Sequence, residues 1–357
     1  MMLRSTGKKP KGKIIKKILC IVPGIIVLIS TTAVALLRNE IATVASIKKI
    51  SDRPVYEIEY HGEYSFDKYL KTGVKSELEM EQFLKKNLAH GLAAIGGSGT
   101  KKRGCSAFLA KTPKGDVIMA RDLDTPAAMP AVVKTSPKGG YKAVGMANLY
   151  QCIGYPKVGK KELDFKSKPY TLASPYFTFD GMNEKGLAAA VFTLAGSKAS
   201  ADAGKATLYD TTVIRMMLDK AKNVEEGIRL LQQYNVVFGT YPSQYMIADA
   251  AGNSAVIEFV DGRMQVINKQ GDYQIVSNFQ LYNNESLSGF GADRYKAYDD
   301  VLSKTKGVIN TEDALKLLEK NTIHGDAQWS AVYNLTQRTI SLAIYNDYDT
   351  VFRYQVK

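Results

Sequence analysis

Short stretches typical of β-strands recur in adjacent pairs along this chain, and this pairing limits the possible folds more than any other feature of the sequence. Each stretch is apolar or alternates apolar with polar residues, and turn-forming residues separate it from the next. After residue 104 the stretches are 105–111, 117–121, 185–194, 245–250, 255–260, 274–278, 330–335, 339–345 and 351–356. Because the members of a pair are joined by short turns, we expect hairpins and therefore antiparallel sheets.

Amphipathic helical patterns are grouped between these strands. They cover 209–222, 224–234, 293–303 and 312–320, and the second begins at a capping box formed by Asn223 and Glu226. Runs of strands with separate groups of helices are typical of layered α+β proteins and not of a parallel βαβ fold. We therefore assign the chain to the α+β class.

A smaller folded segment precedes the main run of strands. Residues 55–60 alternate apolar and polar side chains, and Ser76 with Glu79 forms a capping box that predicts an amphipathic helix over 77–90. Residues 91–104 are rich in Gly, Ser, Thr and Lys, which is the composition of an exposed loop. This loop marks the boundary between the N-terminal segment and the rest of the chain.

The first 37 residues have the pattern of a membrane anchor. Residues 18–37 carry no charged side chain and are long enough to cross ~30 Å of hydrocarbon as a helix. Basic residues crowd the side before this run, which places the N-terminus in the cytoplasm and everything after the run outside. We expect residues 1–17 to be a basic cytoplasmic tail and 18–37 a transmembrane signal anchor. The alternative is a secreted protein, cleaved near Ala35, because Ala33-Val34-Ala35 suits a signal peptidase.

The net charge of +13 does not indicate nucleic-acid binding. Residues 1–37 contribute +7 through Arg and Lys with no acidic side chain before position 38, and the remaining +6 is spread without a basic run. No cluster of His, Cys, Asp and Glu has the spacing of a metal site, and the glycines at 96–99 lack the flanking strand and helix of a phosphate-binding loop. We expect neither a metal nor another cofactor.

Two cysteines, Cys105 and Cys152, lie beyond the apolar run. In an oxidising compartment they could form a disulfide, and the chain would then be an anchored binding module without enzymatic activity. Cys105, however, directly follows Gly104 where the loop ends and a strand begins. A glycine leaves its carbonyl open to the neighbouring thiol and tolerates the strained backbone of an N-to-S acyl shift. The bond between Gly104 and Cys105 is therefore a candidate site of self-cleavage.

Cleavage at this bond would make 38–104 a stem and pro-segment and would give Cys105 a free α-amine. Such an amine has an unperturbed pKa of about 7.7–8.0 and could act as general base for its own thiol. The three histidines, His61, His90 and His324, have no local pattern of a catalytic base. A papain-like protease that uses Cys105 and His324 is a second enzymatic alternative. The sequence signature that surrounds the nucleophile of such proteases is, however, absent around Cys105.

Motifs in a fixed order run from Cys105 to the C-terminal part of the chain. They are Gly104-Cys105-Ser106-Ala107, Ala120-Arg121-Asp122-Leu123-Asp124, Asp180-Gly181-Met182-Asn183-Glu184-Lys185-Gly186-Leu187, Met246-Ile247-Ala248-Asp249, Gly252-Asn253-Ser254-Ala255-Val256-Ile257-Glu258, Ser277-Asn278-Phe279 and Asp293-Arg294-Tyr295. Together they resemble the linear amide C–N hydrolases of the choloylglycine hydrolase and penicillin V acylase superfamily over nearly all of 105–357. The resemblance implies a four-layer αββα N-terminal-nucleophile fold for 105–357, with hydrolysis of a small-molecule N-acyl amide through a thioester on Cys105. Acyl transfer to another amine is the same chemistry with a different acceptor.

The resemblance also implies a role for each matched residue. Cys105 would be the nucleophile. Asp124 would hold the new α-amine, and Arg121 would stabilise the thiolate. Asn278 would donate its side-chain amide to the oxyanion, a contribution of roughly 3–4 kcal/mol for one donor in other acyl-transfer enzymes. Arg294 would orient this cluster.

One position departs from the family pattern. The second asparagine of the oxyanion hole is replaced by Thr193, whose hydroxyl or backbone N–H could substitute. Specificity for bile salts or penicillin V is therefore not implied.

We interpret Asn183 as a structural turn residue before Gly186, and the Asp-Gly pairs at 180–181 and 261–262 as turns. The aromatic residues Tyr150, Tyr155, Phe177 and Phe192 are candidates for an apolar acyl pocket. The long segment before Cys105 resembles that of the acyltransferase and acid-amidase relatives, which keep a sizeable N-terminal piece bound after cleavage.

Overall fold

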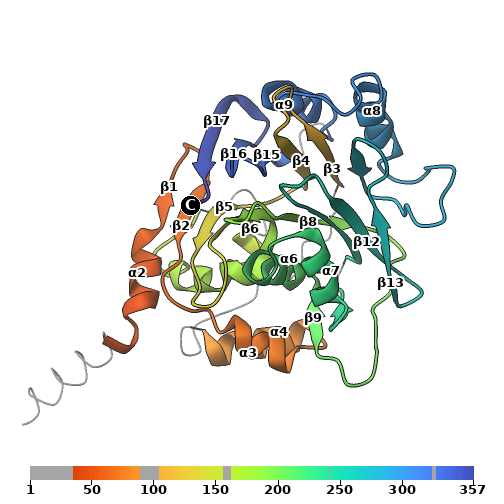
Figure 1. Ribbon diagram of the computed structural model, residues 1–357. Helices are drawn as coiled ribbons and strands as arrows, with labels where there is room; N and C mark the ends of the chain where they lie inside the picture. The colour runs from red at the N-terminus through yellow and green to blue at the C-terminus, as the bar shows by residue number, and fades with distance from the viewer. Residues whose placement is uncertain (1–34, 89–103, 156–161, 240, 324–326) are drawn as a thin grey trace, which may run out of the picture.

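Two β-sheets stack face to face between layers of helices in the computed structural model, which describes residues 35–88, 104–155, 162–239, 241–323 and 327–357 (Figure 1). The nine-stranded sheet has the order β1 (Lys48–Lys49), β2 (Tyr56–Glu59), β5 (Pro130–Thr135), β6 (Ala143–Asn148), β7 (Thr178–Asn183), β8 (Ala188–Thr193), β11 (Ser243–Ala248), β12 (Ser254–Val260) and β13 (Arg263–Asn268). The six-stranded sheet has the order β14 (Gln274–Val276), β3 (Gly104–Lys111), β4 (Val117–Asp124), β15 (Ala327–Asn334), β16 (Thr339–Ile344) and β17 (Asp347–Gln355).

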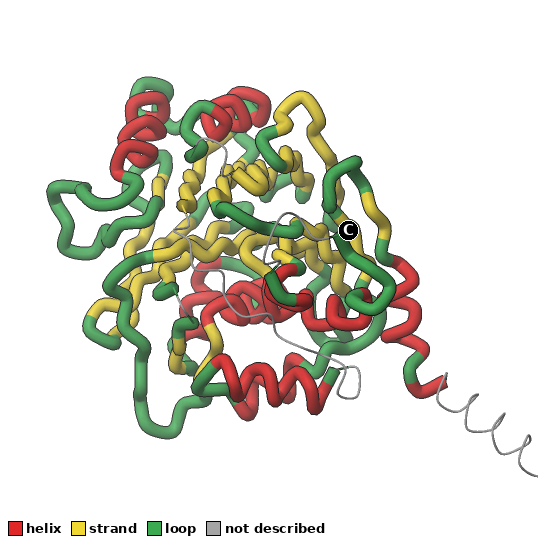
Figure 2. Tube along the Cα trace, turned by 180° about the vertical axis from the view of Figure 1, so that it is seen from behind, coloured by secondary structure: helices red, strands yellow, loops and turns green. Residues whose placement is uncertain are grey.

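Helices cover the outer face of each sheet. On the six-stranded sheet, α8 (Ala292–Leu302) packs against β14 and β3, and α9 (Thr311–Glu319) packs against β4 and β15. On the nine-stranded sheet, α6 (Asp210–Lys220) packs against β7 and β8, and α7 (Val224–Leu231) against β11. The order helix, sheet, sheet, helix is also visible from behind (Figure 2). The remaining elements are α2 (Arg38–Ser46), α3 (Phe66–Thr72), α4 (Glu77–Asn87), α5 (Tyr150–Ile153), a 3₁₀ helix (Lys168–Phe177), and the strand pair β9 (Thr207–Tyr209) and β10 (Asn235–Val237).

The predicted α+β class and the hairpins are confirmed. Strands β3 and β4, β11 and β12, and β15 to β17 pair antiparallel with their neighbours in sequence. The predicted capping boxes are present as well: the Ser76 hydroxyl accepts the Glu79 N–H at 3.2 Å, and Asn223 Oδ1 accepts the Glu226 N–H at 2.9 Å. Two pairs, β2 with β5 and β9 with β10, are parallel. In both pairs the partners lie far apart in the chain, so no hairpin connects them.

One turn prediction was wrong. Asp261 and Gly262 do form the tight turn between β12 and β13, with φ angles of 50° and 74°. Asp180 and Gly181, by contrast, lie inside β7, where Gly181 pairs directly with Gly145 of β6. A Cβ on Gly181 would lie 2.6 Å from the Val144 carbonyl oxygen and 2.8 Å from the Gly145 Cα. This glycine therefore permits close packing of two strands, and the Asp-Gly pair forms no turn.

The segment before Cys105 is part of the folded unit. Strand β2 lies in the nine-stranded sheet beside β5 (Figure 1). The rings of Phe66 and Tyr69 of α3 and of Phe83 of α4 pack against Tyr176 of the 3₁₀ helix. Tyr64 donates its hydroxyl hydrogen to Asp219 Oδ2 at 2.6 Å, and Asp219 in turn pairs with the fully buried Arg215. Removal of this segment would leave that ion pair and one edge of the sheet uncovered.

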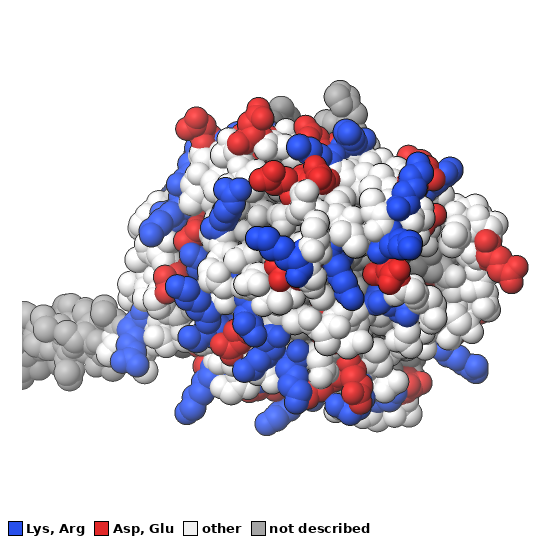
Figure 3. Space-filling model, turned by 45° about the horizontal axis from the view of Figure 1, so that its top comes forward, with Lys and Arg blue, Asp and Glu red and all other residues white. Residues whose placement is uncertain are grey.

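The predicted transmembrane anchor at 18–37 lies outside the described residues except for 35–37. Within the described ranges, no helix has both the length and the apolar character needed to cross a membrane. On the face shown in Figure 3, lysines and arginines are interspersed with acidic side chains and do not form one continuous patch.

Candidate active site

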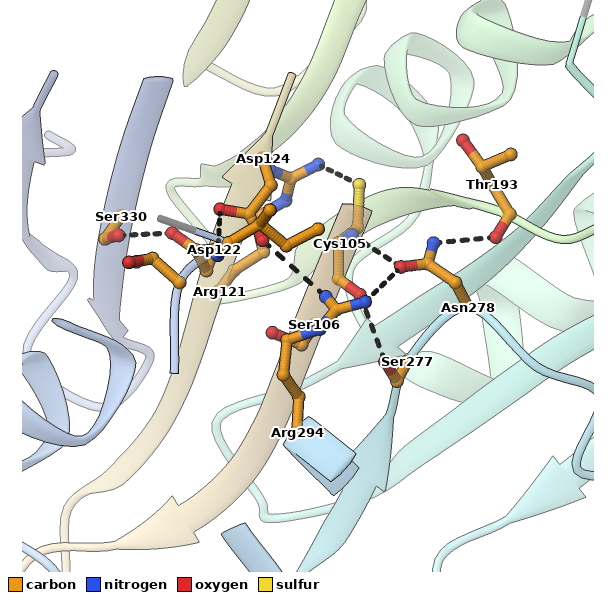
Figure 4. Close-up of polar contacts among 12 residues, drawn as sticks. Cys105, Ser106, Arg121, Asp122, Asp124, Thr193, Ser277, Asn278, Arg294 and Ser330 are labelled. Atoms are coloured by element: carbon orange, nitrogen blue, oxygen red, sulfur yellow. Dashed lines mark hydrogen bonds and ion pairs between the residues drawn. The ribbon is translucent and has the colours of Figure 1, made fainter. Parts of the chain in front are cut away.

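The hairpin of β3 and β4 carries most of the predicted site residues, and strand alternation distributes them over its two faces. Cys105 lies opposite Leu123 and Ala107 opposite Arg121, so the side chains of Cys105 and Arg121 share the face toward the nine-stranded sheet. The other face, toward α8 and α9, carries the side chains of Asp122 and Asp124. Gly104 and Cys105 begin β3, at the end of this hairpin away from its turn. Cys105 lies between Arg121 and Asn278 (Figure 4).

On the inner face, Arg121 is the residue beside the thiol. Its Nη2 lies 3.9 Å from Cys105 Sγ and donates to the Val191 carbonyl oxygen at 3.1 Å. Burial raises the pKa of the Cys105 thiol above its ordinary value, because the thiolate would lose its hydration, and the charge of Arg121 opposes this rise. Cys105 is only 2% exposed in the uncut chain.

Arg121 is itself held by a residue of the opposite sheet. Its Nε lies 3.0 Å from Asp180 Oδ2, and both side chains are fully buried. Asp180 also accepts the indole N–H of Trp329 at 2.9 Å and the hydroxyl hydrogen of Tyr333. Sequence reasoning missed this role because Asp180 was taken as a turn residue. Its position at the start of the motif at 180–187 was the available signal.

Asn278 connects the peptide nitrogen of Cys105 to Arg294. Asn278 Oδ1 accepts the Cys105 N–H at 2.7 Å and a hydrogen from Arg294 Nη2 at 2.8 Å. Its amide nitrogen donates to the Thr193 carbonyl oxygen at 2.7 Å. Thr193 therefore meets Asn278 through its backbone, and its hydroxyl points away from Asn278 (Figure 4). The predicted residues Cys105, Asn278, Arg294 and Thr193 are thus in one connected group.

Asp124 lies against Gly104, the residue before the predicted nucleophile. A Cβ added to Gly104 would be 3.2 Å from Asp124 Oδ2 and 2.4 Å from the Ile323 side chain. Asp124 Oδ1 accepts the Ile323 N–H at 3.1 Å, and Asp124 Oδ2 lies 3.7 Å from Arg294 Nη1. A side chain at position 104 would therefore have to displace the end of the Ile323 side chain and press on Asp124.

Asp122 is a second buried carboxyl that sequence reasoning did not single out. It is two residues before Asp124 on the same face of β4, and each of the two carboxyls has a buried Oδ2 without a hydrogen-bond partner among the described residues. Burial, followed by the neighbouring charge of Asp122, raises the pKa of Asp124 to about 10. The spacing of two in a strand was the signal that could have indicated this pair.

A narrow pocket with a free volume of about 40 Å³ is lined by Cys105. Its lining contains both apolar and polar side chains. The apolar side chains are Leu123, Phe177, Phe179, Val191 and Phe192, and the polar ones include Gln151, Asp210, Thr211, Tyr241 and Ser243. Glu77, at the start of α4, adds a residue of the N-terminal segment to this wall. Of the four aromatic residues expected at an acyl pocket, Phe177 and Phe192 line it, whereas Tyr150 is buried in the core and packs against Tyr155.

The alternatives to this site gain no support from the structure. Cys105 and Cys152 are both free thiols, so the disulfide of the binding-module hypothesis is not formed. His324, the base required by a papain-like mechanism, lies outside the described residues. Among the residues that are described, no group of His, Cys, Asp and Glu could hold a metal ion.

Comparison with known proteins assigns first the fold and then the family. The structure is similar to that of penicillin V acylase from Agrobacterium tumefaciens, with a TM-score of 0.51, 18% identity, and coverage of 70% of this chain and 86% of the other. Penicillin V acylase from Pectobacterium atrosepticum is 33% identical over 120 residues, which are 30% of this chain and 32% of that relative. Residues 105–315 match the linear amide C–N hydrolases, choloylglycine hydrolase family. The chain belongs to this family, and its match to the curated relative spans about a third of that relative's length.

We predict that Asp180→Asn destabilises the fold strongly. The substitution keeps the size of the side chain but leaves the buried Arg121 without its counter-charge, which typically costs about 3–5 kcal/mol. The free energy of unfolding in urea measures the loss. Asp261→Asn, in the exposed pair with Lys198, is the matched control and should leave the urea midpoint unchanged. Equal midpoints for Asp180→Asn and the wild type would show that the buried pair has no stabilising role.

Proposed function

We propose that this protein cleaves itself between Gly104 and Cys105 and then hydrolyses an N-acyl amide through a thioester on Cys105. The observation that carries the proposal is the position of Cys105, which has Arg121 beside its thiol and Asn278 at its peptide nitrogen, on the wall of the pocket. These contacts support a thiol nucleophile that uses its own α-amine as base. Transfer of the acyl group to another amine would use the same first half-reaction.

The contacts of the uncut chain support a division of roles after cleavage. The new α-amine would occupy the place of the present peptide nitrogen, beside Asn278 Oδ1 and close to the Asp124 side of the hairpin. It would take the proton of the thiol, and Arg121 would favour the resulting thiolate by its positive charge. The Asn278 amide, now donating to the Thr193 carbonyl, would turn to the oxyanion of the tetrahedral intermediate.

The pocket supports a substrate with an apolar acyl group. Phe177, Phe179 and Phe192 would pack against that group, while the polar side chains of Asp210 and Tyr241 would face the amine portion. Two relatives named penicillin V acylase are consistent with an aromatic acyl group. Conjugated bile salts and penicillin V themselves are not assumed, because Thr193 departs from the family asparagine.

The pro-segment would remain bound after cleavage. Its contacts with 105–357 include the β2–β5 pairing, the Tyr64 bond to Asp219, and the packing of Tyr69 against Tyr176 with ring centroids 5.4 Å apart. Since residues 18–37 are proposed to anchor the chain with the catalytic domain outside the cytoplasm, the anchor would hold that domain without a covalent link. Secretion after signal cleavage near Ala35 is the alternative localisation.

The wild-type protein should yield a fragment that begins at Cys105, and Cys105→Ala should abolish it, because the alanine has no nucleophile for the acyl shift. Intact mass and N-terminal sequencing of both proteins make this test. Cys152→Ala is the matched control, since Cys152 is also a buried free thiol but lies in α5. It should be cleaved like the wild type. An uncut wild-type chain, or cleavage that persists in Cys105→Ala, would contradict the proposal.

After cleavage, the fragment 105–357 should sediment with membranes, because the pro-segment binds it and the anchor holds the pro-segment. High salt should not release it, since buried apolar contacts dominate, whereas urea should release it. A variant without residues 1–37 is the control and should give both fragments in the soluble fraction, eluting together on size exclusion. Separation of the two fragments without denaturant would contradict retention. A wild-type protein found only in the medium would favour signal cleavage.

A further inference from the structure

We propose that Asp122 and Asp124, the carboxyl pair, share one proton in the uncut chain and that Asp124 gives this proton to the nitrogen of Cys105 during self-cleavage. The inference rests on the proposed function. It assigns to Asp122 a positioning role, because Asp122 acts through Asp124 and does not touch the reacting bond.

The first support is the geometry of the pair. Both side chains are fully buried and point to the same face of β4. Asp122 Oδ2 and Asp124 Oδ2 are both buried and have no hydrogen-bond partner among the described residues. A single proton between these two oxygens would give both of them a partner and would remove the repulsion of two buried carboxylates.

The second support is the set of hydrogen bonds that hold the other carboxyl oxygen, Oδ1, of each residue. Asp122 Oδ1 accepts the Ser330 hydroxyl hydrogen, and that hydroxyl also contacts the Tyr348 hydroxyl at 2.7 Å. Asp124 Oδ1 accepts the Ile323 N–H. These partners orient the carboxyl groups so that the shared proton lies on the side near Gly104, where Asp124 Oδ2 would be 3.2 Å from an added Cβ.

The third support is the charge around the pair. The ionisable side chains that act on it from the packed elements are Cys105 of β3, Arg121 of β4, Arg294 and Tyr298 of α8, and Tyr348 of β17. Glu319 of α9 acts on Tyr348. Arg294 is the cation in ion-pair contact, 3.7 Å from Asp124, and one cation balances one negative charge. A pair with one proton therefore fits this environment, whereas a doubly ionised pair would leave a buried negative charge without balance.

The uncut chain needs a proton at this place. When Cys105 Sγ attacks the Gly104 carbonyl, the bond between that carbon and the Cys105 nitrogen breaks, and the departing nitrogen must gain a hydrogen. Asp124 supplies it, the proton released by the thiol restores the pair, and the products are a thioester of Gly104 on Cys105 and a neutral α-amine. Water then hydrolyses the thioester to the Gly104 carboxylic acid and the free thiol.

Asp122→Asn tests the inference through the pH dependence of self-cleavage. The asparagine removes the neighbouring charge and can donate to Asp124, so Asp124 should lose its proton at lower pH than in the wild type. Newly translated precursor, incubated at pH 5 to 9, should show similar rates for both proteins at pH 5. At pH 8 the variant should be slower by about tenfold or more, the scale of general acid catalysis. Asp261→Asn, the same change in the exposed pair with Lys198, is the control and should follow the wild-type pH dependence.

The proton itself can be observed in Cys105→Ala, which stays uncut. The infrared spectrum of Cys105→Ala minus that of Cys105→Ala/Asp122→Asn, both recorded at pH 8, should contain the C=O band of a protonated carboxyl. Absence of that band overturns the inference. Cleavage of Asp122→Asn with the wild-type pH dependence also overturns it and leaves the proposed function intact, whereas a wild-type chain that stays uncut at every pH overturns both.

Discussion

The buried ion pair between Arg121 and Asp180 is the interaction on which the rest of the site depends. Arg121 belongs to β4 of the six-stranded sheet and Asp180 to β7 of the nine-stranded sheet, so their contact at 3.0 Å ties the two sheets together. Trp329 and Tyr333 donate to Asp180 and complete its hydrogen bonding. A buried charge pair is tolerated only with such partners. The same arginine then presents Nη2 to the thiol of Cys105, which means that fold stability and thiol environment depend on one side chain.

Strand alternation explains how one hairpin serves two tasks. Residues with odd numbers on β4 face the thiol, and those with even numbers face α8 and α9, where Arg294 lies. The thiol thus receives a positive neighbour, while the carboxyls are kept apart from it on the other side of the strand. The peptide nitrogen of Cys105 lies at the end of both faces and is held by Asn278. Self-cleavage and later amide hydrolysis would use the same groups, since each requires a thiol, a nitrogen and a donor in fixed positions.

Much of the fold could be predicted from local patterns, because hairpins and capped helices are encoded by neighbouring residues. The Ser76 and Asn223 caps and the hairpin of β3 and β4 are examples. Strand β6 was not predicted, since its sequence Ala-Val-Gly-Met-Ala-Asn has one β-branched residue and an internal glycine. Glycine favours close packing there only because Gly181 lies opposite, and pairing across the sheet is not visible in the local sequence.

The same distinction applies to the site. Cys105, Arg121, Asp124, Asn278, Arg294 and Thr193 could be named from their motifs, and the structure brings them together. Asp180 was misread because Asp-Gly is a strong local turn signal, whereas its partner Arg121 is 59 positions earlier in the chain. Asp122 was not singled out because a charged residue in a strand is usually solvated, and only the stacking of α8 and α9 on this face buries it.

The most direct test of the central claim is to trap the acyl-enzyme. Self-cleaved protein is mixed with a chromogenic anilide that has an aromatic acyl group, quenched in acid within the first turnover, and digested for mass spectrometry. The account predicts that the peptide beginning at Cys105 gains the mass of the acyl group and loses it on treatment with hydroxylamine, as a thioester does. An acyl group on another residue, or full turnover of the anilide by Cys105→Ala, would contradict the assignment of Cys105 as the nucleophile.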